Sequence, residues 1–316
     1  MNLHKDNTLF RKTIRAAAQH LEINEVFVEK DYWITLLLNR LSKSTYAKNS
    51  VFKGGTSLSK CFGLINRFSE DVDIAIIHEA GKSGTEVKKI IRTIEKEMTR
   101  ELTEIKIDGV TSKGSRFRKS VHEYESIDKK NKDNKLIVEV NSFANPFPYQ
   151  VRSIKSMVHD FLAQTGNTKL VQQYNLQPFQ INVLNKEQTL LEKLVSLIRF
   201  SFDTHPIESM KKKIRHFYDL HYLMNDTTCV SFVKSDEFNM KLDEIVTHDK
   251  KIFGEPIGWR EKTIAESPLI NDFDNVWKQI KSTYKMELSA LAYASIPDEV
   301  HVANSFKKIV NLIEGI

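Results

Sequence analysis

The sequence predicts an α+β protein, with a mixed sheet flanked by helices in its N-terminal part and mainly helices in its C-terminal part. Short runs rich in valine and isoleucine alternate with segments of helical periodicity in the first half of the chain. A glycine pair separates one of these runs from a helix-sized segment. Near Gln188 the pattern changes, and most later segments have helical periodicity alone. We therefore expect domains at residues 1–175 and 176–316.

Length and composition allow two compact domains, each with its own hydrophobic core. The chain has 316 residues, of which 41% are hydrophobic, and a formal net charge of +6. A moderately basic protein suits a polyanionic partner such as RNA, although many ordinary proteins have the same balance. Charge alone therefore does not decide between nucleic acid and other partners.

Cysteine content and hydropathy argue against several classes of protein. The two cysteines, Cys61 and Cys229, are far apart and form no C-x-x-C pair, which argues against a disulfide framework and against a cysteine-rich zinc site. The N-terminal residues contain no apolar signal core, and no segment reaches the apolar length that spans a bilayer. We expect no membrane association and a cytoplasmic location.

Hydrophobic spacing predicts the individual elements. Residues 7–41 are expected to form two helices, because their apolar side chains recur at helical intervals. Further helices are expected at residues 56–62, 86–102, 189–202 and 211–224. Short apolar or β-branched runs predict strands at residues 51–52, 72–77, 105–110 and 136–140.

Asp71 and Asp73 form the most informative pair in the sequence. Side chains two residues apart on a strand point to the same face, so both carboxylates project together and repel each other. Oxygen ligands suit Mg²⁺, and a bound cation would remove this repulsion. Two metal ions about 3.5–4 Å apart can activate an attacking oxygen and stabilise a leaving one. The plain alternative is a solvated pair at the end of a strand.

A third carboxylate would complete such a site, and Glu139 is the best candidate. In the segment LIVEVNSF, alternation places Leu136, Val138 and Val140 on one face and Glu139 on the other. Glu139 is thus a lone acid inside an apolar strand. It could instead be an outward residue on an edge strand.

The stretch Gly54-Gly55-Thr56-Ser57 precedes the acid pair and begins a short helix. Glycines let the backbone approach a ligand closely, and a helix start offers N–H groups to a phosphate. The hydroxyl of Thr56 or Ser57 can donate a hydrogen bond, and Arg67 adds a cation nearby. A glycine pair before a helix is often only a turn. The order of strand, GG[ST], helix, D-x-D strand and later acid strand nevertheless favours a nucleotidyl-transfer site.

The same order is the signature of the nucleotidyltransferase superfamily related to polymerase beta. More narrowly, the segment GGTSLSKCFGLINRFSEDVDI resembles the AbiEii family of abortive-infection toxins from type IV toxin–antitoxin systems. Three further segments are similar to that family and follow its order: VEKDYWITLLLNRL, LLEKLVSLIRF and RHFYDLHYL. The resemblance extends over residues 28–223, and we identify no similar segment in the last ninety or so residues. It implies a nucleotidyltransferase fold for the N-terminal domain.

The resemblance also implies roles for individual residues. Gly54, Gly55, Thr56 and Ser57 would bind the nucleotide phosphates, and Asp71 and Asp73 would hold Mg²⁺. Lys193 would contact the triphosphate, and Asp219 would be the late acidic residue of the family. Glu139, as a third metal ligand, depends on the wider superfamily pattern and on its place in the strand. We include Arg67 among the residues expected to bind the nucleotide.

The residues taken alone allow other interpretations of the later positions. Lys193 lies along an apolar stripe, so it either extends to solvent or points into a site. Asp219 lies between Tyr218 and Leu220, where a buried ion pair with Lys193 or Arg215 would satisfy it. Arg67 can pair with Asp71 or with a phosphate.

The expected activity is a Mg²⁺-dependent transfer of a nucleotide from a nucleoside triphosphate to an acceptor hydroxyl, with release of pyrophosphate. By resemblance, the acceptor is the 3′ end of tRNA, its modification blocks translation, and a cognate antitoxin exists. The basic stretches at residues 112–119 and 211–215 would follow an RNA backbone, although they could equally be solvated surface. The alternatives are a protein or small-molecule hydroxyl as acceptor, or a nucleotide-binding module without catalysis.

Overall fold

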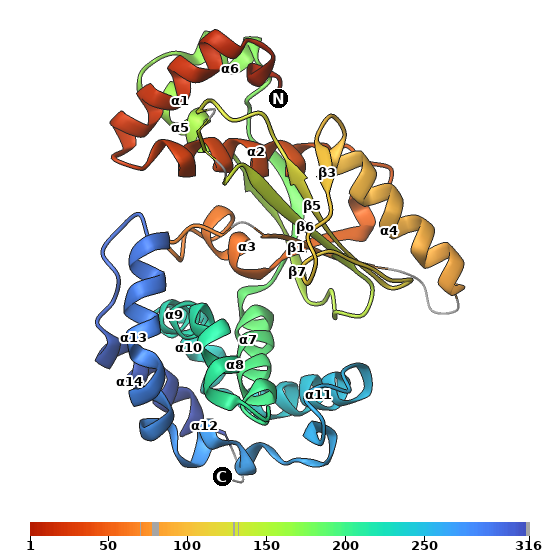
Figure 1. Cartoon of the computed structure of the whole chain (residues 1–316), viewed down its shortest axis with the longest axis vertical. Helices are drawn as coiled ribbons and strands as arrows, with labels where there is room; N and C mark the ends of the chain where they lie inside the picture. Colours follow the sequence, from red (N-terminus) through yellow and green to blue (C-terminus); the bar gives the residue numbers. More distant parts are fainter. Residues whose placement is uncertain (70, 78–81, 129, 132, 314–316) are drawn as a thin grey trace. The chain divides into compact units, whose positions relative to one another are not determined.

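The computed structural model describes residues 1–69, 71–77, 82–128, 130–131 and 133–313. The chain divides into two compact units (Figure 1). The first comprises Met1–Gly63 and Phe68–Leu184, and the second comprises Leu64–Arg67 and Asn185–Ile316. This junction lies later than the one expected after residue 175, because the strand β8 (Phe179–Leu184) pairs with two strands of the first unit.

A single mixed sheet runs through the described part of the first unit, in the strand order β3-β5-β6-β2-β1-β8-β7, with β4 paired to β5. Its other strands are β1 (Ser50–Lys53), β2 (Asp71–Ile76), β3 (Thr103–Ile105), β4 (Ser112–Lys113), β5 (Phe117–Glu123), β6 (Lys135–Asn141) and β7 (Tyr149–Ile154). β2 pairs antiparallel with β1 and parallel with β6, and β1 pairs parallel with β8. The predicted mixed sheet flanked by helices is therefore confirmed.

Four of the six α-helices described in the first unit begin at side-chain caps that the sequence provides. The six are α1 (Asn7–Leu21), α2 (Glu25–Leu41), α3 (Gly54–Lys60), α4 (Gly84–Thr99), α5 (Met157–Gln164) and α6 (Thr168–Gln173). Those with a side-chain cap are α1, α2, α4 and α5. Asp6 caps α1 by accepting a hydrogen bond from the N–H of Leu9, and Asn24 caps α2 in the same way. At α4, Ser83 and Glu86 form a reciprocal capping box. The two helices predicted over residues 7–41 are confirmed.

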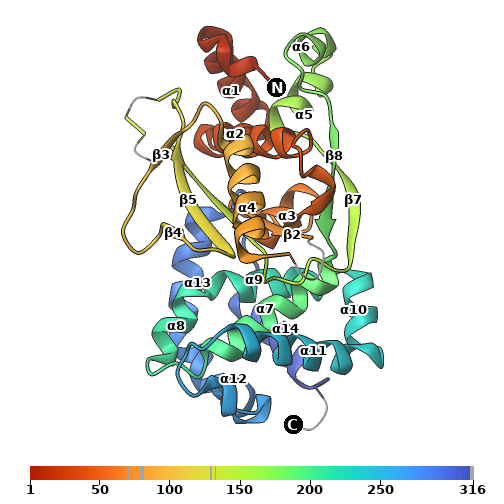
Figure 2. The ribbon, with the colours of Figure 1, turned by 90° about the vertical axis from the view of Figure 1, so that its right-hand side faces the viewer.

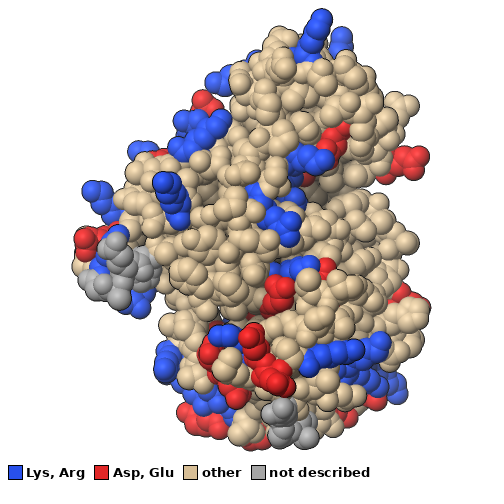
Figure 3. All heavy atoms as spheres, turned by 180° about the vertical axis from the view of Figure 1, so that it is seen from behind, with Lys and Arg blue, Asp and Glu red and all other residues tan. Residues whose placement is uncertain are grey.

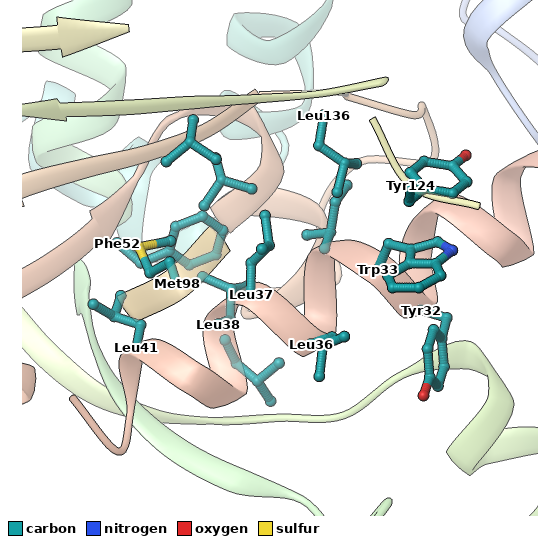
Figure 4. Close-up of a cluster of buried hydrophobic side chains, with 14 of the residues drawn as sticks. Tyr32, Trp33, Leu36, Leu37, Leu38, Leu41, Phe52, Met98, Tyr124 and Leu136 are labelled. Carbon is teal, nitrogen blue, oxygen red and sulfur yellow. The ribbon is translucent and has the colours of Figure 1, made fainter. Parts of the chain in front are cut away.

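The core of the first unit lies where α2 and α4 pack on one face of the sheet (Figure 2). Figure 4 shows part of this core, with residues of α2 between Phe52, Met98 and Leu136. The ring of Trp33 on α2 stacks on Tyr124, with centroids 5.2 Å apart. β2 and β6 turn buried valine and isoleucine side chains toward this core, namely Val72, Ile74, Val138 and Val140. Their alternate residues therefore point to the opposite face of the sheet.

Two expectations differ from the structure. The strand expected at residues 105–110 ends at Ile105, and the carbonyl of Ile107 then accepts hydrogen bonds from the N–H groups of Val110 and Thr111. Gly109, with φ +78°, supplies the left-handed conformation of this turn. The region between residues 117 and 184 also contains strands and helices that were not predicted, namely β5, β7, β8, α5 and α6.

The second unit is built from helices in the described part of the chain. They are α7 (Lys186–Phe200), α8 (Pro206–Lys212), α9 (Ile214–Leu223), α10 (Thr227–Val233), α11 (Glu237–Ile252), α12 (Pro268–Asn271), α13 (Phe273–Leu291) and α14 (Glu299–Val310). An aromatic cluster joins three of them, since Phe273 stacks on Phe306 at 4.7 Å and Phe217 packs against both. None of the described helices has both the length and the apolar character needed to cross a bilayer.

Candidate active site

Three carboxylates lie on the sheet face opposite to α2 and α4. Asp71 and Asp73 are two residues apart on β2, so their side chains share this face. The parallel register between β2 and β6 places Glu139 directly beside Asp73. The structure thus brings together the three acids that the sequence singled out as a group.

Lysines complete the same row of residues across four neighbouring strands. Lys53 of β1 is the antiparallel partner of Asp73, and Lys119 of β5 is the antiparallel partner of Glu139. The Nζ atom of Lys119 lies 3.7 Å from a carboxylate oxygen of Glu139. Sequence reasoning did not assign these lysines to the site, because strand register across β1, β2, β6 and β5 is not visible in the sequence.

Asp73 is the carboxylate of this group whose pKa is shifted by burial and by the neighbouring charges. Burial raises its pKa well above the usual range, and the charges of Glu139 and Asp71 raise it further, while Lys53 and Lys119 act in the opposite direction. The carboxylates therefore repel one another more than the nearby lysines compensate. A divalent cation would relieve this repulsion directly.

The donor chemistry fits a hard cation, but the three carboxylates do not converge on one point. Among the described residues, no three His, Cys, Asp or Glu side chains are grouped in a way that could hold a metal ion. Glu139 instead lies near Lys119, and its Oε1 accepts a long hydrogen bond of 3.4 Å from Asn141. A change of side-chain rotamer at Glu139 would be needed to bring it to the same ion as Asp71 and Asp73.

Gly54 begins α3 in close contact with the acid pair. Its φ of +80° is unfavourable for any residue with a side chain. A β-carbon built on Gly54 would lie 2.3 Å from Oδ2 of Asp73, which is too close for any real contact. Glycine is therefore required at this position for two independent reasons. The carboxylate occupies the space that a side chain would take.

Thr56 and Ser57 use their hydroxyl protons within the protein. Thr56 Oγ1 donates to the carbonyl of Asp71 over 2.6 Å, and Ser57 Oγ donates to the carbonyl of Gly54 over 2.8 Å. Both residues are buried. The Thr56 hydroxyl fixes the start of α3 to β2, and the Ser57 hydroxyl bonds within the first turn of α3. Both arrangements differ from the direct phosphate contact that the sequence suggested.

Lys193 and Asp219 lie in the second unit and form a buried ion cluster with Arg67. The two carboxylate oxygens of Asp219 accept hydrogen bonds from Arg67 over 2.8 and 2.7 Å, and Lys193 Nζ lies 2.6 Å from Asp219 Oδ2. The side chain of Asp219 is 0% exposed and that of Arg67 is 3% exposed. Arg67 therefore pairs with Asp219, whereas the sequence had suggested Asp71 or a phosphate.

Electrostatics explain why Asp219 stays charged in this position. Burial alone would raise the pKa of Asp219, but the charges and hydrogen bonds of Arg67 and Lys193 outweigh burial and hold the pKa well below its usual range. His216 lies one helical turn earlier on α9, and burial together with the charge of Lys193 lowers its pKa.

The chain segment around Arg67 is held by other residues of the second unit. Arg67 forms a β-bridge with Ala292, and the N–H of Tyr293 donates to the carbonyl of Asn66 over 3.0 Å. The N–H of Asn66 in turn donates to the hydroxyl of Tyr218 over 3.3 Å. The ion cluster of Arg67, Lys193 and Asp219 is thus supported by contacts at Arg67 and at the preceding residue, Asn66.

Comparisons with known proteins bear on the family of the chain. Residues 36–310 match the family described as nucleotidyl transferase AbiEii toxin, type IV toxin–antitoxin system. Among solved structures, the nucleotidyltransferase toxin MenT4 from Mycobacterium tuberculosis H37Rv has 16% sequence identity and a TM-score of 0.49, with 95% of this chain and 98% of that chain covered. No curated protein matches the sequence. The family match covers most of the chain, and the protein therefore belongs to the AbiEii family of nucleotidyltransferase toxins of type IV toxin–antitoxin systems.

Proposed function

We propose that this nucleotidyltransferase toxin uses Mg²⁺ to transfer a nucleotide from a nucleoside triphosphate to the 3′ end of tRNA, which would block translation. The observation that carries the proposal is the pairing of Asp73 with Glu139 on adjacent strands, with Gly54 in contact with Asp73. The tRNA acceptor is proposed from family resemblance. Because nucleoside triphosphates and tRNA are cytoplasmic, we expect the toxin to act in the cytoplasm, together with the antitoxin that its family implies.

Asp71 and Asp73 would hold the cation, with Glu139 as a further ligand or as the acceptor of the proton from the attacking hydroxyl. Bound Mg²⁺ would neutralise phosphate charge and lower the pKa of that hydroxyl. The raised pKa of Asp73 supports this assignment, because a carboxylate under repulsion gains most from a cation. Lys119 would release Glu139 when the cation takes its place as counter-charge.

Gly54 and Gly55 would face the triphosphate, since the absence of a side chain at Gly54 lets the backbone lie in direct contact with Asp73. Thr56 and Ser57 would support this loop through the hydrogen bonds that they already make. We propose that Lys193 contacts the triphosphate, that Asp219 holds its ammonium group in place, and that Arg67 fixes the carboxylate of Asp219. Asp219 and Arg67 would then be positioning residues.

The test is the transfer of label from each α-labelled nucleoside triphosphate to total tRNA, with and without Mg²⁺. We expect the native protein to label tRNA with Mg²⁺ only, and Asp73→Asn to lose this activity. Asp108→Asn is the matched control, because Asp108 is 92% exposed and pairs only with its neighbour Lys106 in the described part of the chain. Periodate-oxidised tRNA, which lacks an intact 3′-terminal diol, should not be labelled.

Absence of labelled tRNA while the protein still binds triphosphate would contradict the proposal. The same reaction with cell extract and with small hydroxyl compounds would then identify a protein or small-molecule acceptor. Labelling of periodate-oxidised tRNA would mean that the modified hydroxyl lies elsewhere in the RNA.

A further inference from the structure

The outer face of α4 carries a continuous row of positive charge. Lys89, Arg92, Lys96 and Arg100 are exposed, and we call these four residues the basic ridge. Their spacing of three, four and four residues places them within an arc of about 80° on the helix. The opposite side of α4 is buried and apolar, with Val87, Ile90, Ile91, Ile94 and Met98. The ridge therefore points directly away from the core.

The charges of the basic ridge are not neutralised by neighbouring acids. Within the described part of the chain, none of its four side chains has an ion-pair partner. The acids of α4 are engaged elsewhere. Glu86 accepts hydrogen bonds from Ser83, Glu95 lies 3.0 Å from Arg118, and Glu97 accepts hydrogen bonds from Thr45. Figure 3, which shows α4 along its left margin, has Lys and Arg side chains gathered there.

The basic stretches that the sequence suggested for RNA binding are more fully compensated. In the stretch 112–119, Lys113 and Arg118 pair with Glu104 at 3.0 and 3.2 Å, and Lys119 lies near Glu139. In the second stretch, Lys211 pairs with Glu208 at 2.7 Å, whereas Lys212 and Arg215 form no ion pair with a described residue. The pairing of these residues leaves the basic ridge as a better candidate for a polyanion than either stretch.

Repulsion within the basic ridge favours an external partner. Like charges four residues apart destabilise a helix slightly, and Arg92, Lys96 and Arg100 form two such pairs. The ridge extends over roughly 16 Å at 1.5 Å per residue. A nucleic-acid duplex carries one negative charge per about 1.7 Å of its axis, so several phosphates can face the ridge at once. Long flexible cations on a convex helix suit phosphates better than base edges.

We propose that the basic ridge binds the phosphate backbone of the RNA acceptor. This inference depends on the proposed function, because it requires RNA as the acceptor. α4 packs on the sheet face opposite to Asp73 and Glu139, so the ridge lies outside the reactive centre. It would hold the double-stranded part of the RNA, while the single-stranded 3′ end extends to the carboxylates. An acidic protein surface is the competing occupant.

The experiment compares two quadruple variants with equal loss of charge. The ridge variant is Lys89→Ala/Arg92→Ala/Lys96→Ala/Arg100→Ala. The control variant replaces four scattered exposed lysines with alanine, at Lys12, Lys169, Lys234 and Lys278. Binding of deacylated tRNA is measured by fluorescence anisotropy without triphosphate, over salt concentrations of about 50 to 200 mM. Turnover of triphosphate on tRNA is measured in parallel.

We expect the ridge variant to bind tRNA on the order of 10-fold or more weakly, with a slope of log K against log[salt] that is smaller by about 3. KM for tRNA should rise while kcat stays near that of the native protein. The control variant should match the native protein in tRNA affinity, salt dependence, KM and kcat. Alanine favours helix, so α4 should remain folded, which far-ultraviolet circular dichroism would check.

Equal tRNA affinity of the ridge variant and the native protein would overturn the inference and leave an acidic protein as the remaining partner for this surface. Equal losses in both variants would also overturn it, because net charge rather than the ridge would then govern binding. Ridge-dependent tRNA binding without any labelling of tRNA would instead contradict the proposed function. The two failures are therefore distinguishable.

Discussion

Gly54 and Asp73 approach so closely that Oδ2 of the carboxylate occupies the space of a side chain, 2.3 Å from where the β-carbon would stand. The backbone at the start of α3 thus packs directly against the side chain of Asp73 on β2. Movement of the loop at Gly54 and movement of Asp73 are coupled, because either one displaces the other.

Gly54→Ala should abolish most of the nucleotidyltransferase activity. The new methyl group must displace Asp73, and the φ of +80° adds backbone strain. Because misplacement of a reactive group by about 1 Å can reduce the rate on the order of 100-fold, we expect a loss of at least that size in kcat/KM. Gly84→Ala is the control, since a β-carbon there meets nothing within 4 Å. Near-native activity of Gly54→Ala would refute the close contact.

The pH dependence of stability should reveal the repulsion at Asp73. The pKa of Asp73 is raised in the folded protein, so the folded state holds this proton more tightly than the unfolded chain does. The metal-free protein should therefore lose stability as the pH rises from the usual carboxyl range through the raised pKa. Mg²⁺ should restore stability above that pKa.

Asp73→Asn should remove this part of the pH dependence and the response to Mg²⁺. Without metal at neutral pH, we expect Asp73→Asn to melt at the same temperature as the native protein or a few degrees higher, since about 1 kcal/mol corresponds to roughly 2–4 °C for a chain of this size class. Thermal denaturation between acid and neutral pH, with and without Mg²⁺, provides the measurement. If Asp73→Asn kept the native pH profile of stability, Asp73 would not be the group whose raised pKa causes it.

Asp219→Asn should strongly destabilise the protein. It would leave Arg67 and Lys193 buried without their counter-charge, for which a loss of about 3–5 kcal/mol in the free energy of unfolding is expected. Glu244→Gln breaks the exposed pair with Lys241 and should change this free energy by less than about 1 kcal/mol. Urea denaturation would compare them. A small effect of Asp219→Asn would mean that the cluster tolerates an unpaired cation.

The Asp219 cluster should also contribute to acid sensitivity. The pKa of Asp219 is depressed in the folded protein, so its stabilisation is present above the unfolded carboxyl pKa of about 3.9 and is lost as the pH falls toward the folded value. Asp219→Asn should show a weaker loss of stability than the native protein between neutral pH and acid. Identical acid-unfolding profiles would contradict this assignment.

Thr56→Val should separate a supporting role from a phosphate-binding role. Valine keeps the shape of threonine and removes the hydrogen bond to the Asp71 carbonyl, which typically contributes about 1 kcal/mol. If Thr56 only positions β2, kcat should fall and KM for the triphosphate should change little. A rise in KM with unchanged kcat would restore the direct phosphate contact that the sequence suggested. Steady-state kinetics distinguish the two.

The sequence was most informative where local chemistry determines the structure. The helices at residues 7–41 have regular apolar spacing and side-chain caps. β2 and β6 are short apolar segments in which acidic residues stand out. β5 was missed because its inward residues are polar. Ser120 and His122 face α4, where His122 Nε2 lies 3.3 Å from Glu95, so polar pairing replaces the apolar pattern.

Only the features of the site that lie within one helix or one strand could be predicted from the sequence. The adjacency of Asp73 and Glu139 depends on a parallel register between strands that are more than sixty positions apart, and sequence spacing does not encode register. Lys53 and Lys119 were missed for the same reason. The pairing of Asp219 with Lys193 was among the alternatives, whereas Arg67 was expected near Asp71 or phosphate, because it lies only four residues before Asp71 in the sequence and its partner Asp219 lies far along the chain.

The four residues Leu64–Arg67 belong to the second unit although the chain on both sides of them belongs to the first. Neither unit is therefore a contiguous stretch of the gene. A fragment that starts at Asn185 would contain Asp219 and Lys193 but would lack Arg67, and the buried carboxylate would lose its bidentate partner. Truncation, limited proteolysis or gene fusion at the main junction would not yield two self-sufficient halves. A chimera that takes its helical part from another protein would therefore need Leu64–Arg67 from that same protein.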